Sequence, residues 1–182
     1  VDGLKWVGLS PDEEPIFQHK NKKRHVEIAN KLLDKAGYKK KADGYRFELM
    51  HDSLPYSEEW KRFGEYIQQA LGKIGIKVII RLEDVPSWLK RTYTTNDFDT
   101  TGNYLYNLSD PVVGVHRAIS IVAIKKGRVF SNGSGWSHPI VEEMFEKATV
   151  EPDSKKRGEY YAVALRIAAE NIPIIWTHEM NF

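Results

Sequence analysis

The sequence predicts an α/β fold, in which helices cover a central sheet. Stretches with helical spacing of apolar residues alternate with stretches of strand-like alternation, which is typical of layered α/β domains. Gly37 and Gly75 each follow a helical stretch, where a left-handed residue closes a helix. The 182 residues are 41% hydrophobic, enough for one well-buried core. We therefore expect residues 1–182 to form one layered α/β domain and not two separate domains.

The first half of the chain supplies two helix and strand pairs. Its clearest signal is a long apolar stripe from Tyr56 to Ile74 with charged residues on the opposite face. The strand that follows has Ile79 on its second face, which suggests cover from both sides. The expected elements are an extended segment over 1–24, a helix over 25–36, a strand over 45–50, a helix over 56–74 and a strand over 76–82.

The second half contains shorter elements and one ambiguous region. Asp84 can cap a short helix with Pro86 in its first turn. Residues 112–138 are hard to assign: residues 112–122 fit either helix or irregular structure, and residues 132–135 form a turn region. The other expected elements are a short strand at Asp97-Phe98-Asp99, a helix from Pro139, a helix from Asp153 and a final strand from Ile174 to Phe182.

Composition excludes several classes of protein. The net charge of +2 is too small to imply nucleic-acid binding, so we expect no nucleic acid partner. The basic run from Lys20 to Arg24 leaves a weak nucleic-acid-binding domain as an alternative, although a solvated surface is favoured. Without cysteine the chain has no disulfide and no thiolate ligand for zinc. We see no apolar run of membrane-spanning length and no signal peptide.

Few residues suggest catalysis. Asp97 and Asp99 could serve as the two carboxylates of a small glycoside hydrolase-like enzyme, but a solvent-facing strand edge has the same spacing. No two of the six histidines have the helical spacing of a zinc site, so we expect neither a metal site nor a cofactor.

Aromatic and polar residues gather instead in the predicted loops, which is the composition of a ligand cleft. For Trp88 and Trp136, packing in the core is an equally good interpretation, since tryptophan is seldom left exposed. The candidate ligand-binding residues are Trp88, Tyr104, Tyr106, Asn107, Asp110, Arg117 and Trp136, with His116 close by.

Several motifs occur in an order that resembles one protein family. Residues 29–38 read Ala-Asn-Lys-Leu-Leu-Asp-Lys-Ala-Gly-Tyr, and residues 67–78 carry an Ile-Gln helix followed by Ile-Gly-Ile-Lys-Val. Asp97-Phe98-Asp99, residues 130–139 and the Glu-Asn-Ile-Pro-Ile-Ile run over 170–175 follow. Over about 25–178 the chain resembles the extracytoplasmic solute-binding proteins of family 5, which serve peptide, nickel and oligosaccharide ABC transporters. Trp136 and His138 replace the usual Tyr and Asn of one motif.

This resemblance implies the type II periplasmic binding protein fold, with residues 1–182 as a single three-layer α/β/α lobe that has a mixed sheet. It also implies a binding protein without catalysis that captures a peptide, an oligosaccharide or a related small solute between two lobes. It implies delivery to an ABC permease, and a periplasmic or extracellular, membrane-anchored location. Because members of the family are far longer, it also implies that this chain is the carboxy-terminal lobe, without the amino-terminal lobe and leader.

The resemblance assigns roles to a few positions. Trp88 corresponds to a pocket-wall tryptophan of the peptide-binding members, and Tyr104 or Tyr106 to a second aromatic wall. Asn107 stands where those members carry the aspartate that holds a peptide amino terminus. Since a neutral amide forms no salt bridge, a sugar or another polyhydroxy or amide compound is favoured as the ligand, unless Asp110 substitutes for that aspartate.

Overall fold

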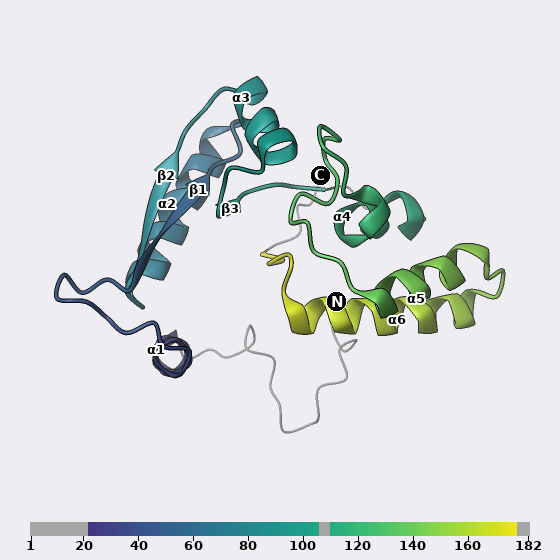
Figure 1. Cartoon of the computed structure of the whole chain (residues 1–182), viewed down its shortest axis with the longest axis horizontal. Helices are drawn as coiled ribbons and strands as arrows, with labels where there is room; N and C mark the ends of the chain where they lie inside the picture. Colours follow the sequence, from purple (N-terminus) through teal and green to yellow (C-terminus); the bar gives the residue numbers. More distant parts are fainter. Residues whose placement is uncertain (1–21, 106–109, 178–182) are drawn as a thin grey trace. The chain divides into compact units, whose positions relative to one another are not determined.

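The computed structural model describes residues 22–105 and 110–177, and its contacts divide the chain into two compact units (Figure 1). We call Gly8–Tyr104 the sheet unit, and Leu105–Phe182 together with Val1–Val7 the helical unit. The single lobe expected over residues 1–182 stays a prediction. Most of the segment expected over 1–24 lies outside the described residues, but the first helix begins at Lys22, slightly earlier than expected.

The sheet unit is built on a parallel sheet. Strand β1 pairs with β2 on one side and with β3 on the other, and both pairings are parallel. The described sheet is therefore parallel and not mixed, while the α/β class is confirmed. The elements of this unit are α1 Lys22–Lys35, β1 Phe47–Asp52, α2 Glu58–Gly72, β2 Ile76–Arg81, α3 Val85–Lys90, the π-helix η2 Arg91–Thr95 and β3 Thr100–Thr101.

The local signals in the sequence explain these boundaries. Gly37 and Gly75 have φ angles of 88° and 80°, the left-handed conformation that ends a helix. The Asp84 carboxylate accepts a hydrogen bond from the backbone nitrogen of Ser87 at 2.8 Å and caps α3. Helix α2 connects parallel strands β1 and β2, as a crossover requires. Ile79, on the second face of β2, is 36% exposed, so cover there is incomplete.

Buried Arg46 connects α1 to the rest of the sheet unit. Its guanidinium donates to the Asp34 carboxylate at 2.5 Å, to the Asn30 side chain at 2.8 Å and to the Ile74 carbonyl oxygen at 2.8 Å. No residue is fully buried in the apolar stripe of α1, and Leu32 in that stripe is 58% exposed. Polar contacts at the end of α1 therefore hold this helix more than apolar packing does.

The helical unit has a small apolar core between its two long helices. The core residues are Ile119, Val141, Phe145, Ala164 and Ala168. The elements of this unit are η3 Pro111–Val113, α4 Val115–Ile119, η4 Ile121–Ala123, α5 Pro139–Val150 and α6 Ser154–Asn171.

The structure settles the ambiguous region and corrects the expected final strand. Residues 111–123 form three short helical turns, and residues 124–138 are irregular. Pro139 is the first residue of α5, and Asp153 caps α6 by accepting from the backbone nitrogen of Lys156 at 2.9 Å, both as expected. The final strand is wrong over residues 174–177, which are not a strand, and residues 178–182 lie outside the described part.

Gly64 allows α2 to approach the end of β1 closely. A Cβ atom at this position would lie 2.5 Å from the Ser53 hydroxyl oxygen and 3.2 Å from the His51 ring. We expect Gly64→Ala to destabilise the protein by about 1–3 kcal/mol through overpacking, measured by urea unfolding. In Gly158→Ala, within α6, the new Cβ meets nothing within 4 Å, so this control should gain up to about 1 kcal/mol in helix propensity. Equal effects of the two substitutions would contradict the prediction.

Candidate functional site

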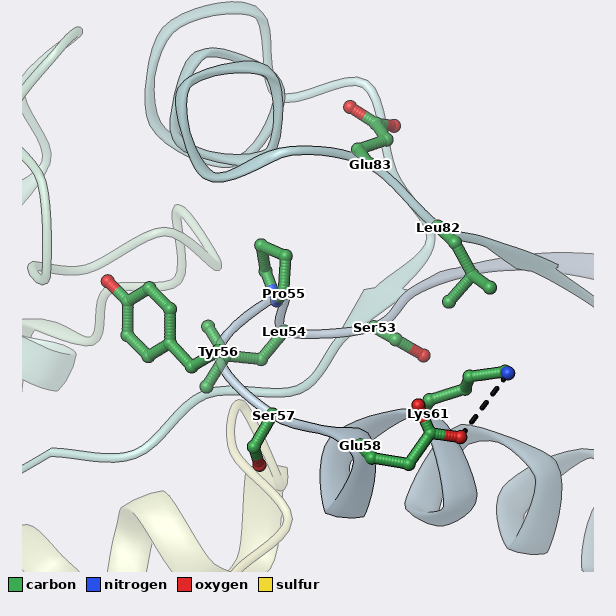
Figure 2. A pocket seen from close by; sticks show the side chains of 9 residues that line it. All are labelled: Ser53, Leu54, Pro55, Tyr56, Ser57, Glu58, Lys61, Leu82 and Glu83. Carbon is green, nitrogen blue, oxygen red and sulfur yellow. Dashed lines mark ion pairs between the residues drawn. The ribbon is translucent and has the colours of Figure 1, made fainter.

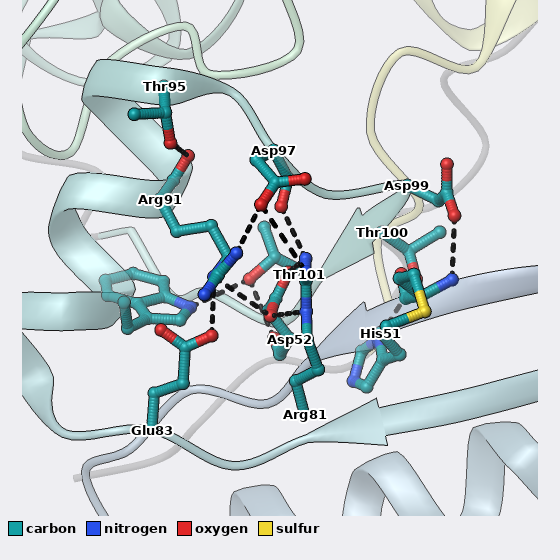
Figure 3. A network of polar contacts seen from close by, with 12 residues as sticks. His51, Asp52, Arg81, Glu83, Arg91, Thr95, Asp97, Asp99, Thr100 and Thr101 are labelled. Atoms are coloured by element: carbon teal, nitrogen blue, oxygen red, sulfur yellow. Dashed lines mark hydrogen bonds and ion pairs between the residues drawn. The ribbon is translucent and has the colours of Figure 1, made fainter.

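The carboxyl ends of the parallel strands carry a network of charged side chains (Figure 3). Asp52, at the end of β1, is 1% exposed and accepts two hydrogen bonds of 2.7 Å from the Arg81 guanidinium at the end of β2. Arg91 lies 3.9 Å from Asp52, pairs with Glu83 at 2.5 Å and also contacts Asp97. Ligands of open α/β sheets bind at this edge of the sheet, so the network marks the edge that a functional site would use.

Asp97 and Asp99 belong to this edge and already have partners. Asp97 pairs with Arg91 and lies 3.6 Å from Arg81. The Asp99 carboxylate accepts a hydrogen bond from the backbone nitrogen of Met50 at 2.7 Å. Both carboxylates thus stabilise the local structure, which is a different use from that expected of a catalytic pair.

An aromatic cluster lies at the same end of β1. The rings of Trp60 and Tyr104 stack at a centroid distance of 6.0 Å and an angle of 20°, and Tyr56 meets Tyr104 edge-on at 5.9 Å. Gly102 makes room for this stack, because a Cβ there would lie 3.3 Å from the Trp60 ring. Tyr56 is 38% exposed, so the cluster presents part of its surface to solvent.

A pocket of about 260 Å³ adjoins the aromatic cluster through Tyr56 (Figure 2). Lys61 and Glu58, on the first turns of α2, form an ion pair of 3.3 Å within it. Its lining residues are Ser53, Leu54, Pro55, Tyr56, Ser57, Glu58, Lys61, Leu82 and Glu83. A pocket of this size accommodates a ring-sized fragment of a ligand, since whole small-molecule sites are usually somewhat larger.

The structure corrects the role expected of Trp88. This residue is 0% exposed, its indole nitrogen donates to the Thr101 hydroxyl at 2.9 Å, and its ring lies against Tyr56 and Tyr93. With no exposed face, Trp88 is a core residue that packs against the ring of Tyr56. Tyr104, by contrast, is only half-buried and lies in the aromatic cluster, while Tyr106 and Asn107 lie outside the described residues.

Asp110, Arg117 and Trp136 lie in the helical unit. The Asp110 carboxylate accepts from the backbone nitrogen of Val112 at 2.9 Å and pairs with Arg157 at 2.7 Å, and these contacts lower its pKa. Arg117 is half-buried on α4. The Trp136 backbone oxygen accepts from the Asn132 amide at 2.8 Å, and its ring packs against the apolar core of the unit.

The sequence reasoning missed four residues of the sheet edge: Tyr56, Trp60, Asp52 and Arg81. The sequence pattern places Tyr56 and Trp60 only in an apolar helical stripe, and in the structure Tyr56 precedes α2. The break at residues 51–55, directly after a strand, was the available signal for Asp52, since strand ends carry functional side chains. No feature of the sequence identified Arg81 as the partner of Asp52.

The described ranges hold neither a group of metal ligands nor a membrane-spanning helix. Within residues 22–105 and 110–177, no three His, Asp or Glu side chains are grouped as ligands of a metal ion. The helices in these same ranges are all too short or too polar to cross a membrane.

A family model matches more than half of the chain. The model of the bacterial extracellular solute-binding proteins, family 5 Middle, matches residues 5–115. The structure is similar to that of HbpA2 from Haemophilus parasuis, with 26% identity, a TM-score of 0.69 and coverage of 81% of this chain and 28% of that one. A dipeptide-binding protein from Pseudoalteromonas, in complex with Met-Leu, gives 25% identity, the same TM-score and the same coverage.

Two further likenesses are weaker. A mannohexaose-bound periplasmic oligopeptide-binding protein from Thermotoga maritima has 24% identity, a TM-score of 0.69 and coverage of 81% of this chain and 29% of that one, which shows the fold alone. A glutamate–tRNA ligase of Granulibacter bethesdensis is 54% identical over 35 residues, which are 19% of this chain and 7% of the ligase. So short a segment shows no shared activity. The chain spans under a third of the solved structures named here.

Removing the charge of Asp52 should destabilise the protein strongly. In Asp52→Asn, Arg81 loses the buried anion that receives two of its hydrogen bonds, and we expect a loss of about 3 kcal/mol in chemical unfolding. Glu48→Gln, in the same strand, is the matched control. Its pair with Lys77 is half-exposed, so the loss should stay below about 1 kcal/mol. Comparable losses in the two variants would show that Asp52 has no special role.

Stability should fall as the pH falls below about 6.5. Burial lowers the pKa of His51 and of His116, so the unfolded chain binds protons at a higher pH than the folded one. The contribution of each neutral imidazole is complete above the unfolded pKa and is lost as the pH falls toward the folded pKa. Thermal unfolding between pH 8 and pH 5 measures this slope. It should be smaller in His51→Asn and smaller again in His51→Asn/His116→Asn, and an unchanged slope would refute the assignment.

Proposed function

The chain belongs to the bacterial extracellular solute-binding proteins of family 5, and we propose that it acts in the substrate-binding component of an ABC importer. The proteins of this family are binding proteins found outside the cytoplasm. We also propose that the ligand is captured between this chain and a second, amino-terminal lobe and is then delivered to an ABC permease. The protein is anchored to the membrane and catalyses no reaction.

The observation that supports a binding role best is the aromatic cluster at the carboxyl edge of the sheet. Tyr104 is held flat against Trp60 and edge-on to Tyr56, so its position is fixed before a ligand arrives. A fixed, partly exposed aromatic surface binds a ring or an apolar side chain at little cost in conformational entropy. The charged network at the same edge of the sheet makes the support of the aromatic cluster rigid.

The charges near residues 107–110 bear on the class of ligand. Asp110 pairs with Arg157 and caps η3, so its carboxylate already has a cationic partner and is a poor substitute for an aspartate that holds a peptide amine. Asn107, outside the described residues, contributes a neutral amide. We therefore propose an uncharged polyhydroxy or amide compound, such as an oligosaccharide, ahead of a free peptide or a metal chelate.

A thermal-shift screen of the 182-residue chain tests both the binding role and the class of ligand. A ligand that binds only the folded state stabilises it by about 2.7 kcal/mol at a concentration of 100 times its dissociation constant. Neutral oligosaccharides should raise the melting temperature more than di- and tripeptides or nickel–histidine do. Hits among peptides alone would overturn the ligand class but keep the binding role, whereas silence across all three classes, repeated with the second lobe present, would overturn the binding role.

Truncation of Tyr104 should weaken binding of any hit by about tenfold, since an aromatic contact contributes around 0.5–1.5 kcal/mol beyond the area that it buries. Isothermal titration of Tyr104→Ala against the unmodified chain measures the change. Tyr66→Ala is the matched control, because Tyr66 lies on α2 and is 64% exposed, outside the aromatic cluster. The affinity of Tyr66→Ala for the ligand should equal that of the unmodified chain within error. An equal loss of affinity in both variants would show that the aromatic cluster does not bind the ligand.

A further inference from the structure

The helical unit contains a stretch without a single acidic residue. Residues 111–141 hold no Asp or Glu, although the whole chain has 25 of them. The same stretch carries four basic residues, namely Arg117, Lys125, Lys126 and Arg128. This part of the chain is therefore distinctly cationic in a protein whose net charge is only +2.

Three of these basic residues lie in a loop that is held firmly at its base. The loop spans residues 121–129, and we call it the basic apolar loop. The Glu142 carboxylate, on α5, accepts from the Ser120 hydroxyl and from the backbone nitrogen of Ile121, both at 2.7 Å. Ala123 is 2% exposed and anchors the loop. Arg128 donates to the Val122 carbonyl oxygen at 3.3 Å and so connects the two sides of the loop.

The outer surface of this loop mixes aliphatic and cationic side chains. Val122 is 67% exposed and Ile121 50%, while Ile124 and Val129 are 38% and 44% exposed. The side chains of Lys125, Lys126 and Arg128 are exposed in the same loop. Glu142 is the first carboxylate after the loop in the sequence, and the two hydrogen bonds that it accepts at the base mean that the loop itself already engages it.

This combination fits a lipid surface better than a protein or a nucleic acid. Protein interfaces are enriched in aromatic residues and depleted in lysine, whereas this loop has two lysines and no exposed aromatic residue. Nucleic acids are bound through basic and stacking side chains and leave exposed aliphatic groups unused. At a membrane, aliphatic side chains enter the boundary of the acyl chains while lysines face anionic headgroups.

We propose that the basic apolar loop docks the protein on an anionic lipid bilayer, with Ile121, Val122 and Ile124 inserted and Lys125 and Lys126 against the headgroups. This attachment is peripheral and reversible, because one short loop inserts few side chains. It goes beyond the proposed binding role and does not depend on it. Its strength should fall as ionic strength rises, since the lysines act through a screened surface potential.

Vesicle flotation of the full 182-residue chain tests the proposal. Vesicles of phosphatidylcholine alone are compared with vesicles of equal parts phosphatidylcholine and phosphatidylglycerol. We expect binding only to the anionic vesicles. Lys125→Glu/Lys126→Glu should weaken partitioning at least tenfold, as each basic residue contributes around 1 kcal/mol near such a surface. Val122→Ser should weaken it several-fold through the lost apolar insertion.

Lys155→Glu/Lys156→Glu on α6 is the matched control, since it changes the net charge equally at two adjacent exposed lysines. It should bind as the unmodified chain does. Equal losses of vesicle binding in the two double variants would show that net charge, and not this loop, causes binding, and would overturn the proposal. Unchanged binding of Val122→Ser would also overturn it. Binding to immobilised polyglutamate without binding to anionic vesicles would also overturn it, in favour of an acidic protein partner. Thermal unfolding of each variant confirms that the fold is retained.

Discussion

The buried contact between Asp52 and Arg81 is the constraint on which the sheet unit depends. It joins the ends of β1 and β2, which are distant in sequence, and Arg91 extends it to η2 and to Asp97. A buried charge is tolerated only when it is paired and hydrogen-bonded, so the surrounding chain must keep these groups in register. The same register places Thr101 within hydrogen-bonding distance of the Trp88 indole and places Gly102 against the Trp60 ring. The aromatic cluster is thus positioned by an ion pair that a ligand need never touch.

Solute-binding proteins must keep a surface open while they are empty, and the two units offer different kinds of surface for this. In the sheet unit, rings and paired charges lie at the end of a rigid parallel sheet. In the helical unit, the polar groups mostly serve the local structure, as Asp110 does for η3 and α6 and as Asn132 does for its own loop. This difference between the units agrees with the proposal that the aromatic cluster of the sheet unit binds the ligand.

Sequence patterns predicted most of the fold because the relevant interactions are local. Caps at Asp84 and Asp153 and left-handed glycines at residues 37 and 75 depend on neighbours in the chain, and all four are present. The site was predicted less well, because its contacts join segments far apart in sequence. Trp88 has an aromatic character that suits either wall or core, and only the three-dimensional packing of Tyr56, Tyr93 and Thr101 around it decides for the core. The parallel sense of the sheet likewise depends on pairings that no local pattern records.

The attachment of α1 through Arg46 has a consequence for how the sheet unit moves. A helix held by apolar packing opens together with the core, whereas a helix held by one guanidinium can detach while the core stays closed. Because the two α1 side chains that bind Arg46, Asn30 and Asp34, share one guanidinium, their contacts would be lost together. Amide protons of α1 would then exchange as one cooperative group, earlier than those of β1 and β2. A sheet unit built in this way can release α1 without disturbing the carboxyl edge of its sheet.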